Sequence, residues 1–173
     1  MKPHAYLFAD GSSSKNDDIG GWAAVAALET QHKVLYGMQA PTTISRCELI
    51  PIIEGLRWIK RNWRRGTNYS VHVYSDSEYT VKALSGIYRP KKNEELWAAV
   101  KQAEDGMIVK YFWRARNTLP YMTTCDAICG AVRRSVIKMM SNCFTDPRAP
   151  ENDIPKGALP HLYEEENEDT TYG

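Results

Sequence analysis

A chain of 173 residues with 43% hydrophobic and 25% charged residues is long enough for one domain with a sizeable core. It contains no apolar run that could span a bilayer, and its start, MKPHAYLF, lacks the apolar stretch of a secretory signal, so we expect no membrane partner. The four cysteines form no C-x-x-C pair and no histidine cluster completes a zinc site, which favours reduced thiols and a cytoplasmic location.

The net charge of +1 hides two regions of opposite sign. Residues 1–143 carry 20 Lys and Arg against 13 Asp and Glu, about +7, and a basic body favours a polyanionic partner. Residues 144–173 carry 2 against 8, about −6, and show no periodicity. We predict a folded domain over 1–143 and an acidic, flexible tail over 144–173. Whether the tail contacts another protein or the basic face stays open.

The first half of the chain predicts an antiparallel meander followed by a helix. Short strands are expected at AYLFAD (5–10), GGWAAVAAL (20–28) and KVLYGM (33–38). Apolar residues then repeat at helical spacing through SRCELIPIIEGLRWIKRNW (45–63), after threonines that suit an N-cap. Pro51 should bend this helix but not end it, because the apolar stripe continues past it.

The second half alternates strands and helices. Strands are predicted at YSVHVYSD (69–76) and IVKYFW (108–113), and helices at SEYTVKALS (77–85), NEELWAAVKQAE (93–104) and CDAICGAVRRSVIKMM (125–140). The order βββαβααβα indicates an α/β fold with a five-stranded mixed sheet, three antiparallel strands followed by parallel ones, flanked by helices.

Four carboxylates occupy the places where these elements begin or end. Asp10 and Asp76 end apolar strands, Glu48 lies early in the long helix, and Asp126 lies near the start of the last helix. Gathered at one sheet edge, four acids would repel one another unless cations neutralised them. Mg²⁺ is a hard ion that takes a few carboxylates together with substrate phosphate, so this pattern favours metal-dependent phosphodiester chemistry. Taken singly, each acid has an ordinary role as a turn, surface or helix-terminus residue.

Five short motifs flank these acids in order along residues 4 to about 138. They are ADGSSSKN with GGWAAV, T-I-S-R-C-E-L, S-D-S-E-Y, N-E-E-L-W, and P-x-x-x-x-C-D before the last helix. In number and order they resemble type 1 ribonuclease H, of the ribonuclease H-like superfamily. The resemblance implies the same fold and an endonuclease that cuts the RNA strand of RNA/DNA hybrids, leaving 5′-phosphate and 3′-hydroxyl ends.

The resemblance assigns Asp10, Glu48, Asp76 and Asp126 as ligands of two Mg²⁺ ions, with Mn²⁺ as a substitute. Two such ions about 4 Å apart can activate a water and stabilise the departing oxygen. It also implies substrate contacts by a set of small and polar residues, each of which has an ordinary alternative as a cap or turn residue. These are Gly11, Ser12, Ser13 and Asn16 near the RNA sugar, Thr43, Ser75 and Asn93 near a DNA phosphate, and Ser45 and Glu78 at positions where the family often has amides.

The chain departs from the family in the loop before Asp126. The family usually has a histidine there that assists proton transfer or product release, whereas this chain has Arg116 ten residues before Asp126. Arginine does not shuttle protons near neutral pH, but its guanidinium stabilises phosphate charge, so we keep Arg116 as a catalytic candidate and expect a changed pH profile or turnover. The alternative is a simple contact with the substrate backbone.

The chain also lacks the basic helical protrusion found in some members, since the stretch from Leu84 to Leu96 is too short for it. Affinity for the hybrid could instead come from a basic run on the long helix, although a solvated face is the commoner explanation for such a run. This run comprises Arg57, Lys60, Arg61, Arg64 and Arg65, interleaved with Trp58 and Trp63.

Two other functions remain open from the sequence, and we expect a monomer in each case. One is another nuclease of the same fold, such as a resolvase-like DNA cutter. The other is a non-catalytic module that binds hybrids.

Overall fold

The computed structural model describes residues 3–16, 18–63, 66, 68–145 and 163–165. Its strands are β1 (Ala5–Ser13), β2 (Gly20–Ala27), β3 (His32–Gln39), β4 (Tyr69–Ser75), β5 (Met107–Trp113) and β6 (Tyr163–Glu165). Its helices are α1 (Ile44–Asn62), α2 (Glu78–Leu84), α3 (Glu94–Glu104) and α4 (Pro120–Thr145).

The strands form one mixed sheet in the order β5-β4-β1-β2-β3-β6. β1 pairs antiparallel with β2, and β2 antiparallel with β3, whereas β1 pairs parallel with β4 and β4 parallel with β5. The predicted fold class, a five-stranded mixed sheet flanked by helices, is confirmed. The short β6, from the region predicted as tail, adds an antiparallel strand at the β3 edge.

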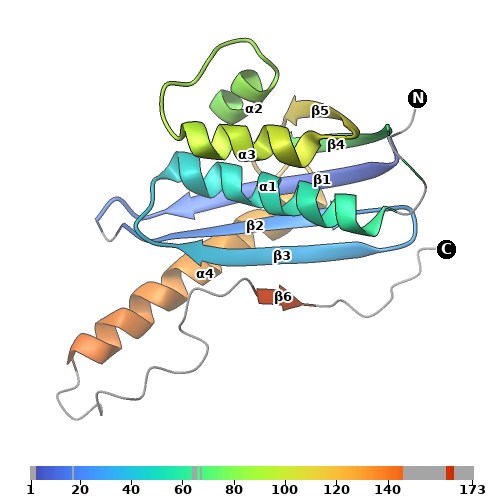
Figure 1. The fold of residues 1–173 in the computed structure, drawn as a ribbon. Helices are drawn as coiled ribbons and strands as arrows, with labels where there is room; N and C mark the ends of the chain where they lie inside the picture. Colours follow the sequence, from blue (N-terminus) through green and yellow to red (C-terminus); the bar gives the residue numbers. More distant parts are fainter. Residues whose placement is uncertain (1–2, 17, 64–65, 67, 146–162, 166–173) are drawn as a thin grey trace.

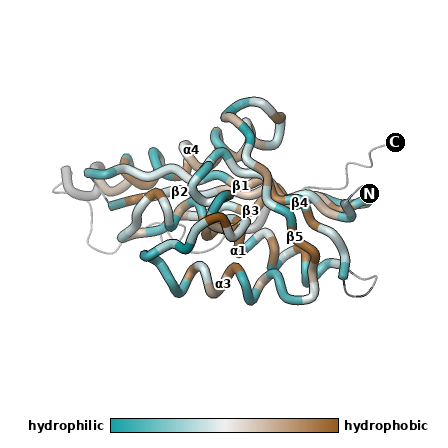
Figure 2. Tube along the Cα trace, turned by 90° about the horizontal axis from the view of Figure 1, so that it is seen from above, coloured by the Kyte–Doolittle hydropathy of each residue, from teal (hydrophilic) through white to brown (hydrophobic). Residues whose placement is uncertain are grey.

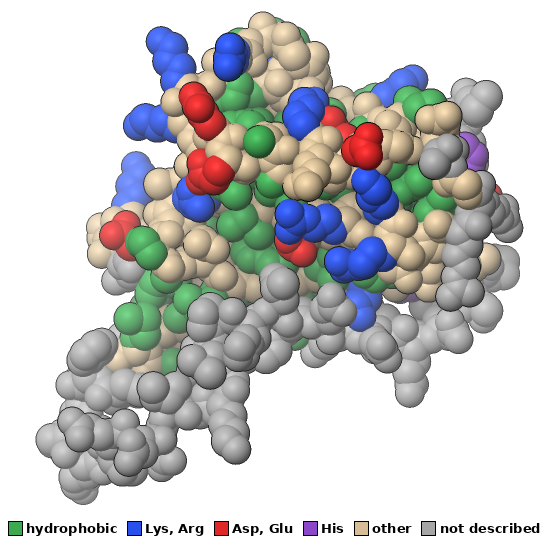
Figure 3. Space-filling model, viewed as in Figure 1, with side chains coloured by type: hydrophobic (Ala, Val, Ile, Leu, Met, Phe, Trp, Pro, Cys, Tyr) green, Lys and Arg blue, Asp and Glu red, His purple; other side chains and the backbone are tan. Residues whose placement is uncertain are grey.

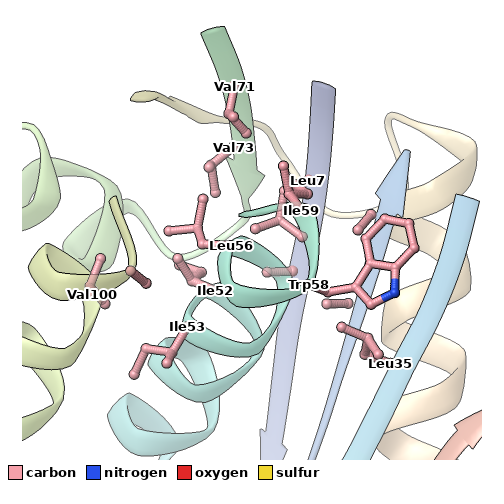
Figure 4. Close-up of a cluster of buried hydrophobic side chains, with 14 of the residues drawn as sticks. Leu7, Leu35, Ile52, Ile53, Leu56, Trp58, Ile59, Val71, Val73 and Val100 are labelled. Carbon is pink, nitrogen blue, oxygen red and sulfur yellow. The ribbon is translucent and has the colours of Figure 1, made fainter. Parts of the chain in front are cut away.

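Helices cover both faces of the sheet (Figures 1 and 2). α1 and α3 pack on one face, where Leu7 of β1, Ile52 and Leu56 of α1, and Val71 of β4 form the main core (Figure 4). α4 packs on the opposite face, where Phe8 of β1 meets Met122, Cys125 and Cys129 of that helix in a second cluster. Alternate residues of β1 therefore serve the two cores, as the period of two in a strand requires.

β1 is longer than the predicted strand 5–10. It continues to Ser13 because β2 pairs with it along its whole length, up to Ser13 opposite Gly20. The parallel pairing with β4 stops earlier, at Phe8 opposite Tyr74. Asp10 thus lies inside a strand, at the point where β1 has lost its neighbour on one side.

The last helix also begins earlier than predicted. α4 starts at Pro120, so Asp126 lies in its second turn and not at its N-terminus. Proline suits the first position of a helix, where a missing N–H costs nothing. Only four residues, YMTT, separate Pro120 from Cys125, and this stretch is too short to show a helical apolar stripe of its own.

The basic run on α1 is only partly described, since Arg64 and Arg65 lie outside the described residues. Trp58 and Trp63 belong to the core or pack against it and are not part of an exposed nucleic-acid face. Arg57 pairs with Glu54 at 2.8 Å and Lys60 with Asp105 at 3.7 Å. Basic and acidic side chains lie close together on this side of the molecule (Figure 3), which agrees with an ordinary solvated face.

Most of the predicted tail, residues 146–162 and 166–173, lies outside the described residues, so the domain boundary at 143 stays a prediction. Among the described residues, no helix is long and apolar enough to cross a bilayer.

Candidate metal centre

The candidate site lies where β1 and β4 separate. Asp76 follows directly after the end of β4, beside the part of β1 that contains Asp10. Asp10 is almost fully buried, at 1% exposure, and one of its carboxylate oxygens accepts a hydrogen bond of 2.8 Å from the amide of Gly11. The carboxyl ends of parallel strands are the usual position of sites in open α/β sheets.

The other two acids come from helices on opposite faces of the sheet. Glu48 lies in the second turn of α1, and Asp126 in the second turn of α4. A continuous sheet would keep these side chains apart. They approach the same strand because no described strand pairs with β1 beyond Phe8 on the β4 side.

The four carboxylates form two groups that share Asp10. Ligand atoms of Asp10, Glu48 and Asp76 all lie within 4.8 Å of one another, and so do those of Asp10, Asp126 and Cys129. Two neighbouring groups with a common carboxylate match what a pair of divalent ions requires. The structure therefore brings together all four acids that the sequence singled out.

The electrostatics of the cluster are unfavourable without a cation. Burial, together with repulsion from Asp76, raises the pKa of Asp10 from 3.8 to about 7. Burial and the charges of Asp10 and Asp76 also raise the pKa of Glu48 well above its usual value. Buried carboxylates that resist ionisation in this way are typical of functional sites.

The donor set of the first group fits a hard cation. Glu48 is 6% exposed, and its Oε2 atom has no hydrogen-bond partner among the described residues. A buried acceptor left unpaired is costly, and a metal ion with oxygen ligands would satisfy it. Ser75, which is 1% exposed, hydrogen bonds to Glu48 and also accepts from the amide of Ser77 at 3.1 Å.

Arg116 is the cation that the structure places at this cluster. Its Nε donates to Asp76 Oδ2 at 3.0 Å, and its Nη1 lies 3.6 Å from Asp126 Oδ1. The pKa of Arg116 is raised by its hydrogen bond to Asp76 and by the surrounding acids, so the guanidinium stays charged. The loop residue that departs from the family pattern thus contacts two of the four carboxylates.

The residues assigned to the RNA sugar lie around the end of β1. Ser12 and Ser13 are half-buried within the strand, and Asn16 is exposed in the turn that follows. Gly11 has a structural role of its own, since a Cβ atom there would lie 2.5 Å from the main-chain carbon of Cys47 on α1. The close approach of β1 to α1 therefore requires glycine, whatever Gly11 does with a substrate.

The residues assigned to the DNA phosphate and the amide positions are spread more widely. Thr43 and Asn93 occupy the N-cap positions of α1 and α3, but neither side chain makes a capping hydrogen bond, and Asn93 instead accepts from Arg46 at 3.2 Å. Ser45 is half-buried in the first turn of α1. Glu78 pairs with Lys82 at 2.6 Å and belongs to neither of the two acid groups.

Sequence reasoning did not single out Cys129 as a site residue. Cys129 is fully buried, and its sulfur lies in the group with Asp10 and Asp126. The available signal was its spacing three residues after Asp126, which places both side chains on one face of a helix. Mg²⁺ prefers oxygen ligands, so the Cys129 thiol lines this side of the site but is a poor ligand for that ion.

The fold and the cluster together define a class of protein: an α/β protein whose mixed sheet presents a four-carboxylate centre suited to divalent cations. Solved structures have the same fold. The N-terminal RNase H domain of Rv2228c from Mycobacterium tuberculosis aligns with a TM-score of 0.69 at 19% identity, over 79% of this chain and 97% of that domain's chain. LC11-RNase H1 in complex with an RNA/DNA hybrid aligns with a TM-score of 0.65 at 17% identity, over 77% and 99%.

Sequence comparison gives the family. The RNase H family model matches residues 2–121. The ribonuclease H of Cupriavidus metallidurans is 32% identical over 70% of this chain and 90% of its own length, and that of Caldicellulosiruptor saccharolyticus is 36% identical over 78% and 96%. The chain therefore belongs to the RNase H family, and the enzyme class that the sequence motifs predicted is confirmed.

Proposed function

We propose that this protein cuts the RNA strand of RNA/DNA hybrids by two-metal-ion hydrolysis, leaving 5′-phosphate and 3′-hydroxyl ends. The observation that carries the proposal is the pair of carboxylate groups sharing Asp10, within a member of the RNase H family. A related structure, LC11-RNase H1, was obtained as a complex with an RNA/DNA hybrid, which supports this substrate.

Asp10, Glu48 and Asp76 would hold one ion, and Asp10 with Asp126 the other. When bound, such ions supply a nucleophilic water at neutral pH and charge stabilisation for the scissile phosphate. Mg²⁺ fits the all-carboxylate set, with Mn²⁺ as a substitute. The role of the chain is to keep its carboxylates ionised and in place: Gly11 fixes Asp10 through its amide, and Ser75 fixes Glu48.

Arg116 is the proposed catalytic residue outside the carboxylates. Its guanidinium lies at the mouth of the site, with 59% of the side chain exposed, where a phosphate would approach the cluster. Phosphoryl transfer depends on positioning and charge neutralisation more than on a protein nucleophile, so an arginine suits this position. The proposed contacts of the hybrid with the residues of the β1 end, the two N-cap positions and Glu78 remain proposals, as do a monomeric state and a cytoplasmic location.

The first experiment is cleavage of an end-labelled RNA/DNA hybrid beside RNA duplex, DNA duplex, DNA junctions and single strands, in Mg²⁺ and in Mn²⁺. We expect hybrid-specific cleavage that requires the metal. Asp76→Asn should lower the rate by about 100-fold or more, because it removes a charge worth several kcal/mol in the transition state. Asp105→Asn is the matched control, since that carboxylate is 87% exposed, pairs with Lys60 and belongs to neither of the two acid groups.

Two results would redirect the assignment. Cutting of DNA duplexes or junctions would favour the resolvase-like alternative. Binding of hybrid without cleavage in either metal would favour a non-catalytic binding module.

A further inference from the structure

We propose that Arg116 is a built-in counter-cation, which offsets part of the negative charge of the metal-free carboxylate cluster. Divalent ions must displace its guanidinium when they bind, so this arginine lowers the metal affinity of the site. The inference rests on the proposed function, since it concerns the same metal centre. It goes further because it assigns Arg116 a role before any substrate is bound.

The contacts of Arg116 carry this inference. Its guanidinium reaches Asp76 at 3.0 Å and Asp126 at 3.6 Å. Asp76 belongs to one of the two carboxylate groups and Asp126 to the other. One positive charge thus spans the two places where two divalent charges would be held, and it engages an oxygen of a ligand in each.

The loop that contains Arg116 is fixed at its base. Trp113 donates from its indole nitrogen to the carbonyl of Asp76 at 3.0 Å, and the amide of Arg114 donates to the carbonyl of Ser75, also at 3.0 Å. The amide and hydroxyl of Thr118 both donate to the carbonyl of Ala115, which closes a tight turn. The main chain therefore holds Arg116 beside the acids, while its half-exposed side chain has room to move into solvent.

Competition follows from charge and geometry. A guanidinium at 3 Å occupies lone pairs that a metal ion would use, and it repels a divalent ion at short range. The folded protein binds metal only after this ion pair has been replaced, which lowers the apparent affinity by the strength of the pair. A charge-assisted hydrogen bond at a partly exposed site contributes about 1–2 kcal/mol, which corresponds to roughly 5- to 30-fold in affinity.

Displacement of Arg116 would also free its planar fork at the mouth of the site. Mg²⁺ bound by few carboxylates keeps positions for substrate phosphate, and a released guanidinium beside it can contact the same phosphate. Without metal, the ion pair would thus offset part of the negative charge of the cluster. Once metal and substrate are bound, the same guanidinium would contact the phosphate instead.

The test measures metal binding directly and without substrate. Free Mn²⁺ is counted by electron paramagnetic resonance during titration of the metal-free full chain at fixed pH and ionic strength, and Mg²⁺ is followed by calorimetry. Arg116→Ala and the more conservative Arg116→Gln should both bind Mn²⁺ about tenfold more tightly than the wild type. Circular dichroism verifies that each variant is folded.

Arg114→Ala is the matched control. It removes the same charge from the same loop, but the Arg114 guanidinium lies over the rings of Tyr74 and Phe112, at 5.6 and 5.9 Å. Among the described residues it forms no ion pair with Asp76 or Asp126, which pair with Arg116. If Arg116→Ala tightens binding and Arg114→Ala does not, the specific ion pair is responsible.

Three outcomes overturn the inference. Equal tightening by Arg114→Ala would show a general charge effect. Unchanged or weaker binding in both Arg116 variants would show that the arginine does not compete with the metal. Absence of Mn²⁺ binding by the wild type and by every variant would reject the metal centre itself and with it the proposed mechanism, which separates that failure from failure of the Arg116 inference.

Discussion

Asp10 is the carboxylate on which both groups of the centre depend, and burial makes its ionisation costly. Its pKa is about 7 in the folded protein and near 3.8 in the unfolded chain. Between these pH values the folded state holds a proton that the unfolded state has released. The free energy of unfolding therefore falls as the pH rises from about 4 to about 7, and the loss is complete above that range.

This fall in the free energy of unfolding with rising pH leads to a prediction for the metal-free protein. Asp10→Asn, which cannot ionise, should be more stable than the wild type at pH 8 by up to a few kcal/mol, and the difference should shrink towards pH 5. Thermal unfolding in the presence of a chelator measures both. A difference that stays constant from pH 5 to pH 8 would contradict the raised pKa. Saturating Mg²⁺ should reverse the order at pH 8, because only the wild-type carboxylate gains a cation.

At the scale of single residues, the sequence predicted the four carboxylates better than it predicted the contacts around them. The four acids were identified because their flanking motifs place them at element boundaries. The contacts of Arg116 with Asp76 and Asp126 could not be foreseen, since they depend on how a loop closes over a sheet. The burial of Ser75 follows the period of β4, since it is in phase with the buried Val71 and Val73, but its hydrogen bond to Glu48 of α1 could not be foreseen.

At the scale of elements, the centre depends on how closely α1 and α4 approach the sheet. On the α4 side, Gly21 of β2 packs against the main chain of that helix: a Cβ atom there would lie 2.2 Å from the carbonyl oxygen of Cys129. This contact is between backbones, so no side-chain rotation relieves it. Asp126 is one helical turn from Cys129 and is positioned by the same contact.

Gly21→Ala is therefore predicted to destabilise the protein by about 1–3 kcal/mol, as overpacking does in well-packed cores. It should also push α4 outward and weaken metal binding, because Asp126 moves with the helix. Urea unfolding and Mn²⁺ titration measure the two effects. Lys15→Ala, in the exposed turn after β1, is the control. A variant with wild-type stability would show that the sheet and α4 yield easily here.

Element positions were predictable from periodicity, and element limits were not. The helix 45–63 was recognised despite Pro51, and α1 does continue through it. The end of β1 was placed too early because Asp-Gly-Ser is typical of a turn, while the long pairing with β2 overrides that preference. The start of α4 was placed too late for a similar reason: packing against β1 and β2, not local pattern, stabilises its first turns.

At the scale of the whole molecule, the two oppositely charged regions make a prediction about substrate binding. The last thirty residues carry about −6 and the rest about +7. A chain that ends at Thr145 should bind an RNA/DNA hybrid more tightly at low salt, with a steeper dependence on salt concentration, because the acidic residues no longer compete with phosphates. Filter binding between 50 and 300 mM salt, as approximate limits, measures this. Equal salt slopes for both chains would show that the acidic region does not act on the basic body.

The interruption between β1 and β4 has a consequence for the molecule as a whole. A sheet normally separates the two hydrophobic cores that flank it, so that each can be altered without the other sensing it. Here the position of Glu48 depends on the core beneath α1, and that of Asp126 on the core beneath α4. Both side chains approach Asp10 where the pairing of β1 with β4 has ended, beyond Phe8. The geometry of the carboxylate centre therefore depends on both sides of the sheet: it is correct only when two otherwise independent cores are packed correctly at the same time.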